Sequence, residues 1–364
     1  MIRIPVSAAS RSYDVLLENG LLARAGRHLA KILKTRRVFV VSVPPVRRRW
    51  AKVFLKSLAE AGFEAQMVEM ADGERAKRLS TLERLAERLV KLGADRGSAC
   101  IALGGGVVGD VTGFLASIYM RGVEVVQVPT TVVAQVDAAV GGKTAVDLKS
   151  GKNLLGTFHQ PRVVLIDPDA LTTLPSREYR AGLYEALKCG IIGNPQLFRL
   201  FERRRREILD RRRDVIERVI AGSVRLKASV VSADERDSGL RQVLNLGHTI
   251  GHALETETRY TQLLHGEAVA WGMIAAAWIA FLLRKLDESS RDRIVNTILS
   301  FGKPPAMKIN AAGVLRRLRS DKKTRDGVVH FILPREIGRV EIVPNVPEEV
   351  VRSAVNEMQA LAAK

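Results

Sequence analysis

The stretch SACIALGGGVVGDVTGFLASI, residues 98–118, decides the fold class. It begins with an apolar run typical of a buried strand, continues into the glycine-rich turn 104–110 and ends in a helical pattern. A strand, a GxGxxG turn and a helix in this order can bind a dinucleotide. Glycines let the backbone approach a pyrophosphate, and the helix offers unpaired N–H groups at its positive end. Taken alone the motif is weak evidence, because a glycine-rich turn can also merely tighten a βα junction.

The sequence around this unit repeats the same alternation. Short β-branched runs predict strands at 37–41, 64–70, 98–103, 123–128 and 163–167. Amphipathic patterns between them predict helices, one of which starts with the capping pair Ser80 and Glu83 and carries Leu82, Leu85 and Leu89 on one face. Alternation of this kind predicts βαβ units around a mainly parallel sheet.

Beyond residue 174 the pattern changes to long helices. We expect helices at 177–188, 196–210, 211–232, 246–257 and 267–285, and a strand hairpin near 328–333 and 339–343. The predicted fold is therefore an α/β Rossmann-like dinucleotide-binding domain, residues 1–174, followed by a mostly α-helical metal- and substrate-binding domain, residues 175–364. A ligand cleft is expected between them.

Length and charge agree with this division. A chain of 364 residues exceeds the usual size of one hydrophobic core, so two domains are expected. The formal charge of +19 favours anionic partners, and nucleic acid is the first alternative it raises. Against that alternative, the arginines at 203–206 and 211–213 lie in a helical pattern typical of a solvated face, and only 5% of the residues are aromatic. Small anionic substrates explain basic pockets equally well.

Cysteine usage and hydropathy bear on location. Cys100 and Cys189 are too few for a disulfide framework, and Cys100 is expected to be a buried thiol. The amino-terminal residues MIRIPV suggest a strand and no signal peptide, so we expect a cytoplasmic protein. The apolar run 268–283 is shorter than the roughly 20 residues that span a bilayer, so it predicts a buried helix and no membrane partner.

Two further groups of residues suggest a site. His248 and His252 stand four apart in a helical pattern, and His265 follows thirteen residues later, which is compatible with metal binding. Polar residues lining a cleft without a metal explain the spacing equally well. Charged and amide side chains also stand in otherwise apolar segments, namely Asp137, Lys143, Lys152, Asn153, Glu185 and Lys188. For Glu185 and Lys188 a surface salt bridge is the simpler explanation.

The combined motifs resemble the dehydroquinate synthase family, in order and at compatible spacing from about residue 72 to 323. They include DGERAK from Asp72, GGGVVGDVTGFLAS from Gly104, YMRG from Tyr119, VPTT from Val128, VDAAVGGKT from Val136, GKNLLGTFHQP from Gly151, EALKCGII from Glu185, LRQVLNLGHTIGHALE from Leu240, HGEAVAWGM from His265 and DKK from Asp321.

The resemblance implies a carbon–oxygen lyase of the shikimate pathway. Such an enzyme converts 3-deoxy-D-arabino-heptulosonate 7-phosphate to 3-dehydroquinate and phosphate. The implied route is transient oxidation by NAD, β-elimination of phosphate, re-reduction and intramolecular aldol closure. Glu185, His248 and His265 are implied to hold Zn²⁺ or Co²⁺, whereas His252 is implied to face the substrate.

The resemblance also assigns the remaining site residues. Around the substrate it places Arg121, Asp137, Lys143, Asn153, Lys188, Lys227, Arg241, Asn245, His252 and one or both of Lys322 and Lys323. On the dinucleotide it places Glu74, Lys77, Gly105, Gly106, Asp110, Thr130, Thr131, Lys143 and Lys152. Arg121 is implied to come from a neighbouring subunit, and therefore a homodimer is expected.

Some positions depart from the family pattern. Residues 42–46 read SVPPV and carry no carboxylate where the family has one for the adenosine ribose, Asp237 replaces a glutamate, and Ala138 and Ala139 replace small hydroxyl residues. Two classes of enzyme remain as rivals. Sister sugar-phosphate cyclases share the metal triad, but Arg241, Asn245 and His252 favour a substrate with a carboxylate. Iron-type alcohol and glycerol dehydrogenases share the domain pattern and would consume NAD stoichiometrically.

Overall fold

The chain forms two compact units in the computed structural model, which describes residues 1–258, 261–306, 311–320 and 329–363. The first unit takes residues Met1–Pro175 and Ile216–Arg236, and the second takes Ser176–Val215 and Asp237–Lys364. The predicted boundary at residue 174 lies beside the first of these changes. Residues 216–236, which the prediction left in the second domain, pack with the first unit.

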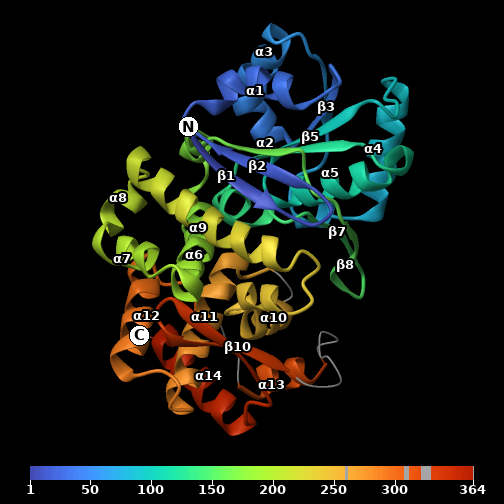
Figure 1. Ribbon diagram of the computed structural model, residues 1–364. Coiled ribbons are helices and arrows are strands. Elements are labelled where there is room, and N and C mark those ends of the chain that lie inside the picture. Colours follow the sequence, from blue (N-terminus) through green and yellow to red (C-terminus); the bar gives the residue numbers. More distant parts are fainter. Residues whose placement is uncertain (259–260, 307–310, 321–328, 364) are drawn as a thin grey trace. The chain divides into compact units, whose positions relative to one another are not determined.

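A seven-stranded sheet forms the centre of the first unit (Figure 1). Its strands are β1 (Ile2–Ser7), β2 (Ser12–Leu17), β3 (Arg37–Ser42), β4 (Glu64–Glu69), β5 (Ala99–Gly104), β6 (Glu124–Pro129) and β9 (Val163–Ile166), in the spatial order β1-β2-β9-β6-β5-β3-β4. Only β1 and β2 pair antiparallel, and all the other neighbours run parallel. The prediction of a mainly parallel sheet is confirmed.

Helices cover both faces of this sheet, as Figure 1 shows. On one face, Val38 and Val40 of β3 pack in a core cluster with Phe54 of α3 (Lys52–Glu60) and with residues of α1 (Ala25–Ile32). On the other face, Phe39 and Val41 pack with residues of α4 (Leu79–Lys91) and α5 (Gly106–Ile118). Because successive side chains of a strand point to opposite faces, these strands are apolar throughout.

Short elements complete the first unit. They are the short helix α2 (Pro44–Val46), the π-helical turns η2 (Arg47–Ala51) and η5 (Ala134–Ala138), and the 3-10 turns η1 (Leu21–Arg24), η3 (Glu74–Ala76), η4 (Tyr119–Arg121) and η6 (Pro168–Thr173). The helix α9 (Arg213–Ala233) contributes most of its length from residue 216 onward. A hairpin of β7 (Lys143–Leu148) and β8 (Gly151–Phe158) was not predicted, since polar and apolar residues do not alternate regularly in it and half of β8 is exposed.

One detail of the predicted first domain is wrong. The helix α4 begins at Leu79, and its N-cap residue is Arg78, which makes no side-chain capping bond. Ser80 therefore lies inside the first turn of the helix, where its hydroxyl cannot serve as the predicted cap. The apolar face of the same helix is correct, because Leu82, Leu85 and Leu89 are buried.

The second unit is mostly helical, as predicted. Its helices are α6 (Ser176–Gly193), α7 (Pro195–Arg203), α8 (Arg205–Leu209), η7 (Leu240–Asn245), α10 (His248–Glu257), α11 (His265–Leu282), α12 (Glu288–Ser300), α13 (Ala311–Ser320) and α14 (Glu348–Ala363). The expected hairpin is present as β10 (His330–Glu336) and β11 (Arg339–Pro344). The helix expected at 196–210 is interrupted, because the backbone of Arg204 leaves the helical region at φ −120° and ψ 31°.

The apolar helix α11 lies in the core of the second unit. Its length and composition would allow it to cross a membrane, but 78% of the helix is buried inside the protein. Trp271, at its centre, has no exposed surface. The prediction of a buried helix is confirmed.

Glycines let α11 touch its neighbours backbone to backbone. A Cβ at Gly266 would lie 1.9 Å from the carbonyl oxygen of Ala181 in α6. A Cβ at Gly272 would lie 1.9 Å from the carbonyl oxygen of Gly247, the N-cap residue of α10. Since real side chains never approach backbone oxygen so closely, any larger residue would push the helices apart.

Replacing Gly272 by alanine is therefore expected to destabilise the protein. Overpacking of this kind costs about 1–3 kcal/mol, which exceeds the roughly 1 kcal/mol that alanine gains over glycine in a helix. The free energy of unfolding in urea measures the loss. Gly97→Ala is a suitable control, because a Cβ there would make only an ordinary contact, 3.5 Å from Oδ1 of Asp95. Equal stability of the two variants would contradict the close contact.

Candidate active site

Three candidate metal ligands converge in the second unit. Glu185 lies in the middle of α6, while His248 and His265 are the first residues of α10 and α11. One potential ligand atom from each residue lies within 4.8 Å of the other two. Nε2 of His265 is 3.4 Å from Oε1 of Glu185, and Nε2 of His248 is 3.9 Å from the same oxygen. The three helices thus bring together residues that are up to 80 positions apart.

Hydrogen bonds orient both imidazole rings toward Glu185. Nδ1 of His248 lies 3.2 Å from the carbonyl oxygen of Leu246, and Nδ1 of His265 lies 3.3 Å from Oε2 of Glu255. When each Nδ1–H donates to its acceptor, the lone pair of each Nε2 faces the carboxylate. Metal-binding histidines usually show this arrangement, in which an outer partner fixes the tautomer.

Charge in the cluster also fits a cation. Glu185 is fully buried, and among the described residues neither of its oxygens receives an aligned hydrogen bond. Lys188 Nζ forms an ion pair with Oε2 at 2.6 Å. Burial alone would raise the pKa of Glu185, but Lys188 and the two histidines hold it well below its usual range. The carboxylate therefore stays ionised, as a metal ligand must be.

The two histidines differ in their protonation. Burial, followed by the charge of Lys188, lowers the pKa of His248 to about 3, so its ring is neutral. Burial acts in the same direction on His265, but its interactions with the carboxylates of Glu185 and Glu255 outweigh burial and raise the pKa to about 10. A carboxylate, a neutral imidazole and an imidazole with one displaceable proton make up a suitable ligand set for a divalent cation.

A second group overlaps the first. His252, Glu255 and His265 also offer ligand atoms within 4.8 Å of one another. The ring centroid of His252 lies 5.2 Å from that of His248 and 5.9 Å from that of His265. Sequence reasoning missed Glu255. Its position three residues after His252, on the same helix face, was the available signal.

In the first unit the glycine-rich turn lies at the switch point of the sheet. β5 follows β4 in the chain but lies between β3 and β6, so the strand order reverses there. Ligands of open α/β sheets bind at this crevice, beyond the carboxyl ends of the strands. Gly105 is the N-cap residue of α5 and makes no side-chain capping bond, and a Cβ on it would lie 3.0 Å from Thr131. Gly105 and Thr131 are therefore close neighbours at this crevice, and Gly106 is the first residue of the helix.

The atypical segment 42–46 lies at the same edge of the sheet. Ser42 ends β3, is fully buried and donates its hydroxyl hydrogen to the carbonyl oxygen of Leu103 at 2.7 Å. Pro44 then begins α2. Ser42 thus ties β3 to β5, which is a structural role and not that of a ribose ligand.

Further predicted residues meet near this crevice. The buried ammonium group of Lys77 donates hydrogen bonds to the side-chain oxygens of Asp110 and Asn153. Lys152 forms an ion pair with Glu74 at 3.5 Å. Five residues that the resemblance assigns to the cofactor or substrate are therefore paired in two groups, one of three residues and one of two.

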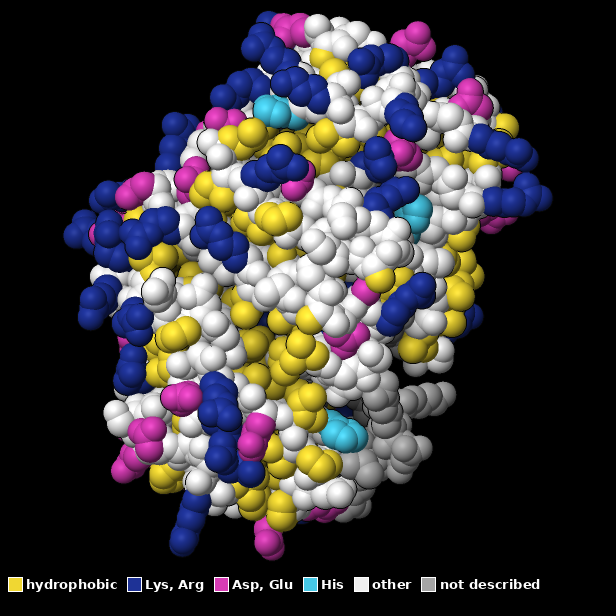
Figure 2. Space-filling model, viewed as in Figure 1, with side chains coloured by type: hydrophobic (Ala, Val, Ile, Leu, Met, Phe, Trp, Pro, Cys, Tyr) yellow, Lys and Arg dark blue, Asp and Glu magenta, His cyan; other side chains and the backbone are white. Residues whose placement is uncertain are grey.

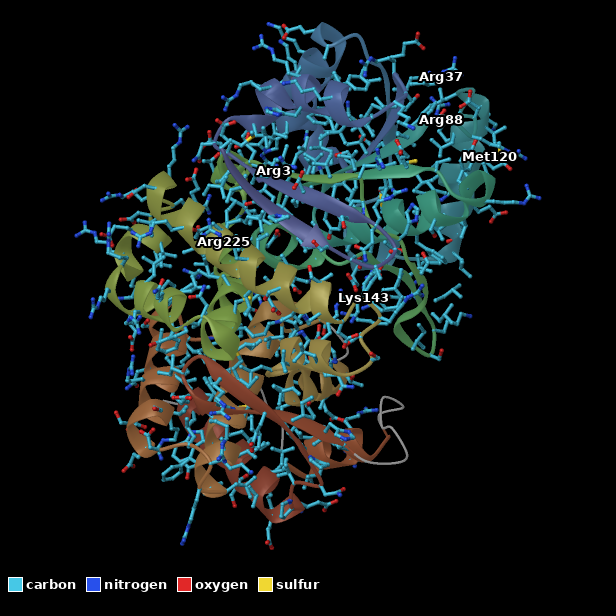
Figure 3. All side chains as sticks on the ribbon, viewed as in Figure 1. Arg3, Arg37, Arg88, Met120, Lys143 and Arg225 are labelled. Carbon is cyan, nitrogen blue, oxygen red and sulfur yellow. The ribbon has the colours of Figure 1, made fainter. Side chains whose placement is uncertain are left out.

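Another pair in the first unit joins α9 to η5. Lys227 Nζ donates to the main-chain oxygen of Asp137 at 2.6 Å and also contacts its carboxylate. Lys227 is 7% exposed, so its charge is largely shielded from water. Lys143 begins β7 and is exposed (Figure 3).

The remaining predicted residues are less closely grouped. Arg241 is buried and Asn245 is exposed, both on η7. Thr130 is buried at the end of β6, where its N–H donates to the carbonyl oxygen of Gly104. Arg121 is exposed in a left-handed backbone conformation at φ 67°. Lys322 and Lys323 lie outside the described residues.

Basic residues do not form one continuous band on the face of the molecule that Figure 2 shows. Lys and Arg side chains are interspersed there with Asp and Glu. Nucleic-acid-binding proteins typically gather their positive charge on one face. This view therefore gives no support to the nucleic-acid alternative.

Comparison with known proteins identifies the family. The pattern described as "3-dehydroquinate synthase N-terminal" matches residues 67–181, and that described as "3-dehydroquinate synthase C-terminal" matches residues 182–324. A 3-dehydroquinate synthase from Koribacter versatilis is 52% identical over 100% of this chain and 99% of its own length.

Two solved structures are similar over nearly the whole chain. One is ValA, a 2-epi-5-epi-valiolone synthase from Streptomyces hygroscopicus subsp. jinggangensis with NAD⁺ and Zn²⁺ bound, at a TM-score of 0.89 and 29% identity over 96% of this chain and 98% of its own. The other is a 2-deoxy-scyllo-inosose synthase with carbaglucose-6-phosphate, NAD⁺ and Co²⁺, at a TM-score of 0.83 and 26% identity over 98% and 99%. Both are lower in identity than the 3-dehydroquinate synthase. This chain belongs to the 3-dehydroquinate synthase family.

Proposed function

We propose that this chain converts 3-deoxy-D-arabino-heptulosonate 7-phosphate to 3-dehydroquinate and phosphate. Family membership over the full length supports the reaction. The observation that carries the proposal is the convergence of Glu185, His248 and His265 around one fully buried carboxylate. A purely structural cluster would not need two imidazole rings whose Nε2 atoms face the same oxygen.

Glu185, His248 and His265 would hold the metal, and the turn after β5 would hold the dinucleotide. When bound, a divalent cation supplies a Lewis acid for the substrate hydroxyls, and NAD supplies a hydride acceptor that returns its hydride within one turnover. Gly105 and Gly106 expose the backbone to the pyrophosphate. The buried pair of Lys77 and Asp110 fixes the adjoining surface of the crevice.

The family resemblance supports a set of nine residues as the substrate-binding residues. They are Arg121, Asp137, Lys143, Asn153, Lys188, Lys227, Arg241, Asn245 and His252. Lys188 is buried beside Glu185, so it supplies a fixed positive charge that solvent screens little. Lys227 holds the Asp137 carboxylate in one orientation, which would place a proton acceptor at Oδ1 or Oδ2.

A homodimer is proposed, with Arg121 acting in the partner's site. Met120 and Arg121 both adopt left-handed backbone angles, at φ 48° and 67°, and such strain is retained chiefly at functional positions. Four exposed apolar side chains occur in this part of the first unit, namely Ile118, Met120, Leu154 and Leu155. A hydrogen bond between Thr157 of β8 and Ser117, the residue before Ile118, joins the two segments that carry them. Met120 is labelled in Figure 3.

A cytoplasmic location remains a prediction. It is supported by the two cysteines, Cys100 and Cys189, which are both buried and not joined in a disulfide.

Removal of the metal is expected to abolish activity. Prolonged chelation should stop phosphate release from the heptulosonate, and added Zn²⁺ or Co²⁺ should restore it. Glu185→Gln should lower the rate by more than about 100-fold, since loss of a ligand exceeds the 10–100-fold typical of an outer-shell partner. Glu178→Gln, at an exposed carboxylate of the same helix, is the control. Activity that survives exhaustive chelation would refute the metal role.

The hydride cycle gives a second test. Enzyme, NAD and substrate should release phosphate continuously, while the absorbance of NADH shows no lasting increase, because the hydride returns to the product. An iron-type dehydrogenase would accumulate one NADH for each molecule of substrate oxidised. Stoichiometric accumulation of NADH in this assay would therefore exclude the proposed reaction.

Subunit mixing tests the role of Arg121. Arg121→Ala and Glu185→Gln should each be nearly inactive alone. If Arg121 acts in the partner's site, random reassociation of the two variants yields mixed dimers with one intact site, and activity should recover to about a quarter of the unmodified level. Native mass spectrometry of the mixture, with one variant carrying a tag, verifies the exchange. No recovery after verified exchange would place Arg121 in its own subunit's site or outside any site.

A further inference from the structure

We propose that Glu255 is the positioning residue of the metal site, holding the His265 ring so that its Nε2 faces the cation. This inference rests on the proposed metal role of Glu185, His248 and His265. It concerns a residue that touches none of the reacting atoms and acts only through His265.

The geometry of the ring supports this assignment. His265 lies between two carboxylates, with Nε2 3.4 Å from Glu185 Oε1 and Nδ1 3.3 Å from Glu255 Oε2. The two nitrogens lie on opposite sides of the imidazole, so each carboxylate faces a different one. If Nε2 binds the cation, its proton is displaced, and the remaining proton must lie on Nδ1. Glu255 is the acceptor for that proton.

The cost of burying Glu255 indicates that the contact is specific. Its side chain is 3% exposed on α10, and a buried carboxylate is stable only when it is well paired. The histidine ring itself retains 36% of its side-chain surface. The ring is therefore not fixed by packing alone, and the hydrogen bond from Nδ1 must hold its orientation.

The ring of His248 is also held by a hydrogen bond from Nδ1, but its acceptor is a main-chain oxygen and not a side chain. Nδ1 of His248 donates to a main-chain carbonyl oxygen, which no substitution of a side chain can remove. Only His265 depends on a side chain for its tautomer. Its acceptor also carries a negative charge, which makes the ring more basic and the bond from Nε2 to a cation stronger.

An alternative role for Glu255 follows from the overlapping cluster. His252, Glu255 and His265 could themselves bind a cation, in which case Glu255 would be a ligand. The fully buried Glu185 between two Nε2 atoms argues against it. If the cation were bound there, only Lys188 would balance the charge of the Glu185 carboxylate. The other lone pairs of that carboxylate would then face no cation.

The experiment measures metal affinity independently of turnover. Metal-free Glu255→Met and Glu255→Gln are titrated with Zn²⁺ against a chromophoric chelator, and each variant is loaded with Co²⁺ for its visible spectrum. Methionine keeps the volume but removes the acceptor, so Zn²⁺ affinity should fall about 10–100-fold. Glutamine keeps a neutral acceptor, so its loss should be smaller. Thermal unfolding of each metal-free variant verifies that it is folded.

The control and the contrary outcomes are distinct. Glu257→Gln changes a carboxylate on the same helix that pairs with Arg317 at 2.6 Å, and it should leave Zn²⁺ affinity unchanged. Unchanged affinity in Glu255→Met would overturn the proposal. A Co²⁺ spectrum that changes coordination in Glu255→Gln, with binding retained in Glu185→Gln, would overturn it in favour of Glu255 as a ligand. Failure of the unmodified chain to bind Zn²⁺ would overturn the metal role as well.

Discussion

Contact between helix backbones is the constraint on which the proposed metal site depends. Glu185, His248 and His265 come from three helices, and side chains of their length meet only if the helix axes are close. Gly266 allows α11 to reach α6, and Gly272 allows it to reach the start of α10. The imidazoles stand at the first residues of their helices, next to these contacts. A small displacement of α11 would therefore separate ligand from ligand before it disturbed the surrounding core.

In the first unit, the glycine-rich turn and the carboxyl edge of the parallel sheet together shape the proposed dinucleotide site. A parallel sheet buried on both faces leaves its carboxyl edge as the place where polar groups gather. There the glycine turn after β5 lies beside Ser42, whose hydroxyl joins β3 to the neighbouring strand. That bond explains how residues 42–46 preserve the shape of the edge without a carboxylate. Ribose binding then has to be supplied by other groups, or else the dinucleotide is held mainly through its phosphates.

Much of this could be predicted from the sequence, and the failures have physical causes. Parallel strands and the core helix α11 were predicted because buried elements are apolar along their length. The β7–β8 hairpin was missed because Thr144 and Asp147 are buried while Leu154 and Leu155 are exposed, so hydrophobic periodicity is weak there. Ser80 carried a capping pattern, but the actual start of α4 at Leu79 depends on how the chain enters the helix. Glu255 was overlooked because a carboxylate that supports a ligand looks, in sequence, like any surface glutamate.

The first unit is built from two separate segments of the chain, and this has a consequence for folding during synthesis. Because residues 216–236 belong to the first unit, that unit lacks Lys227, the partner of Asp137, until the ribosome has already released the first forty residues of the second. The usual sequence of amino-terminal domain first and carboxyl-terminal domain second is thus unavailable to the nascent polypeptide. Neither half can be obtained as a separate gene product by a single truncation, and rearrangements that shuffle whole domains would find no clean boundary here.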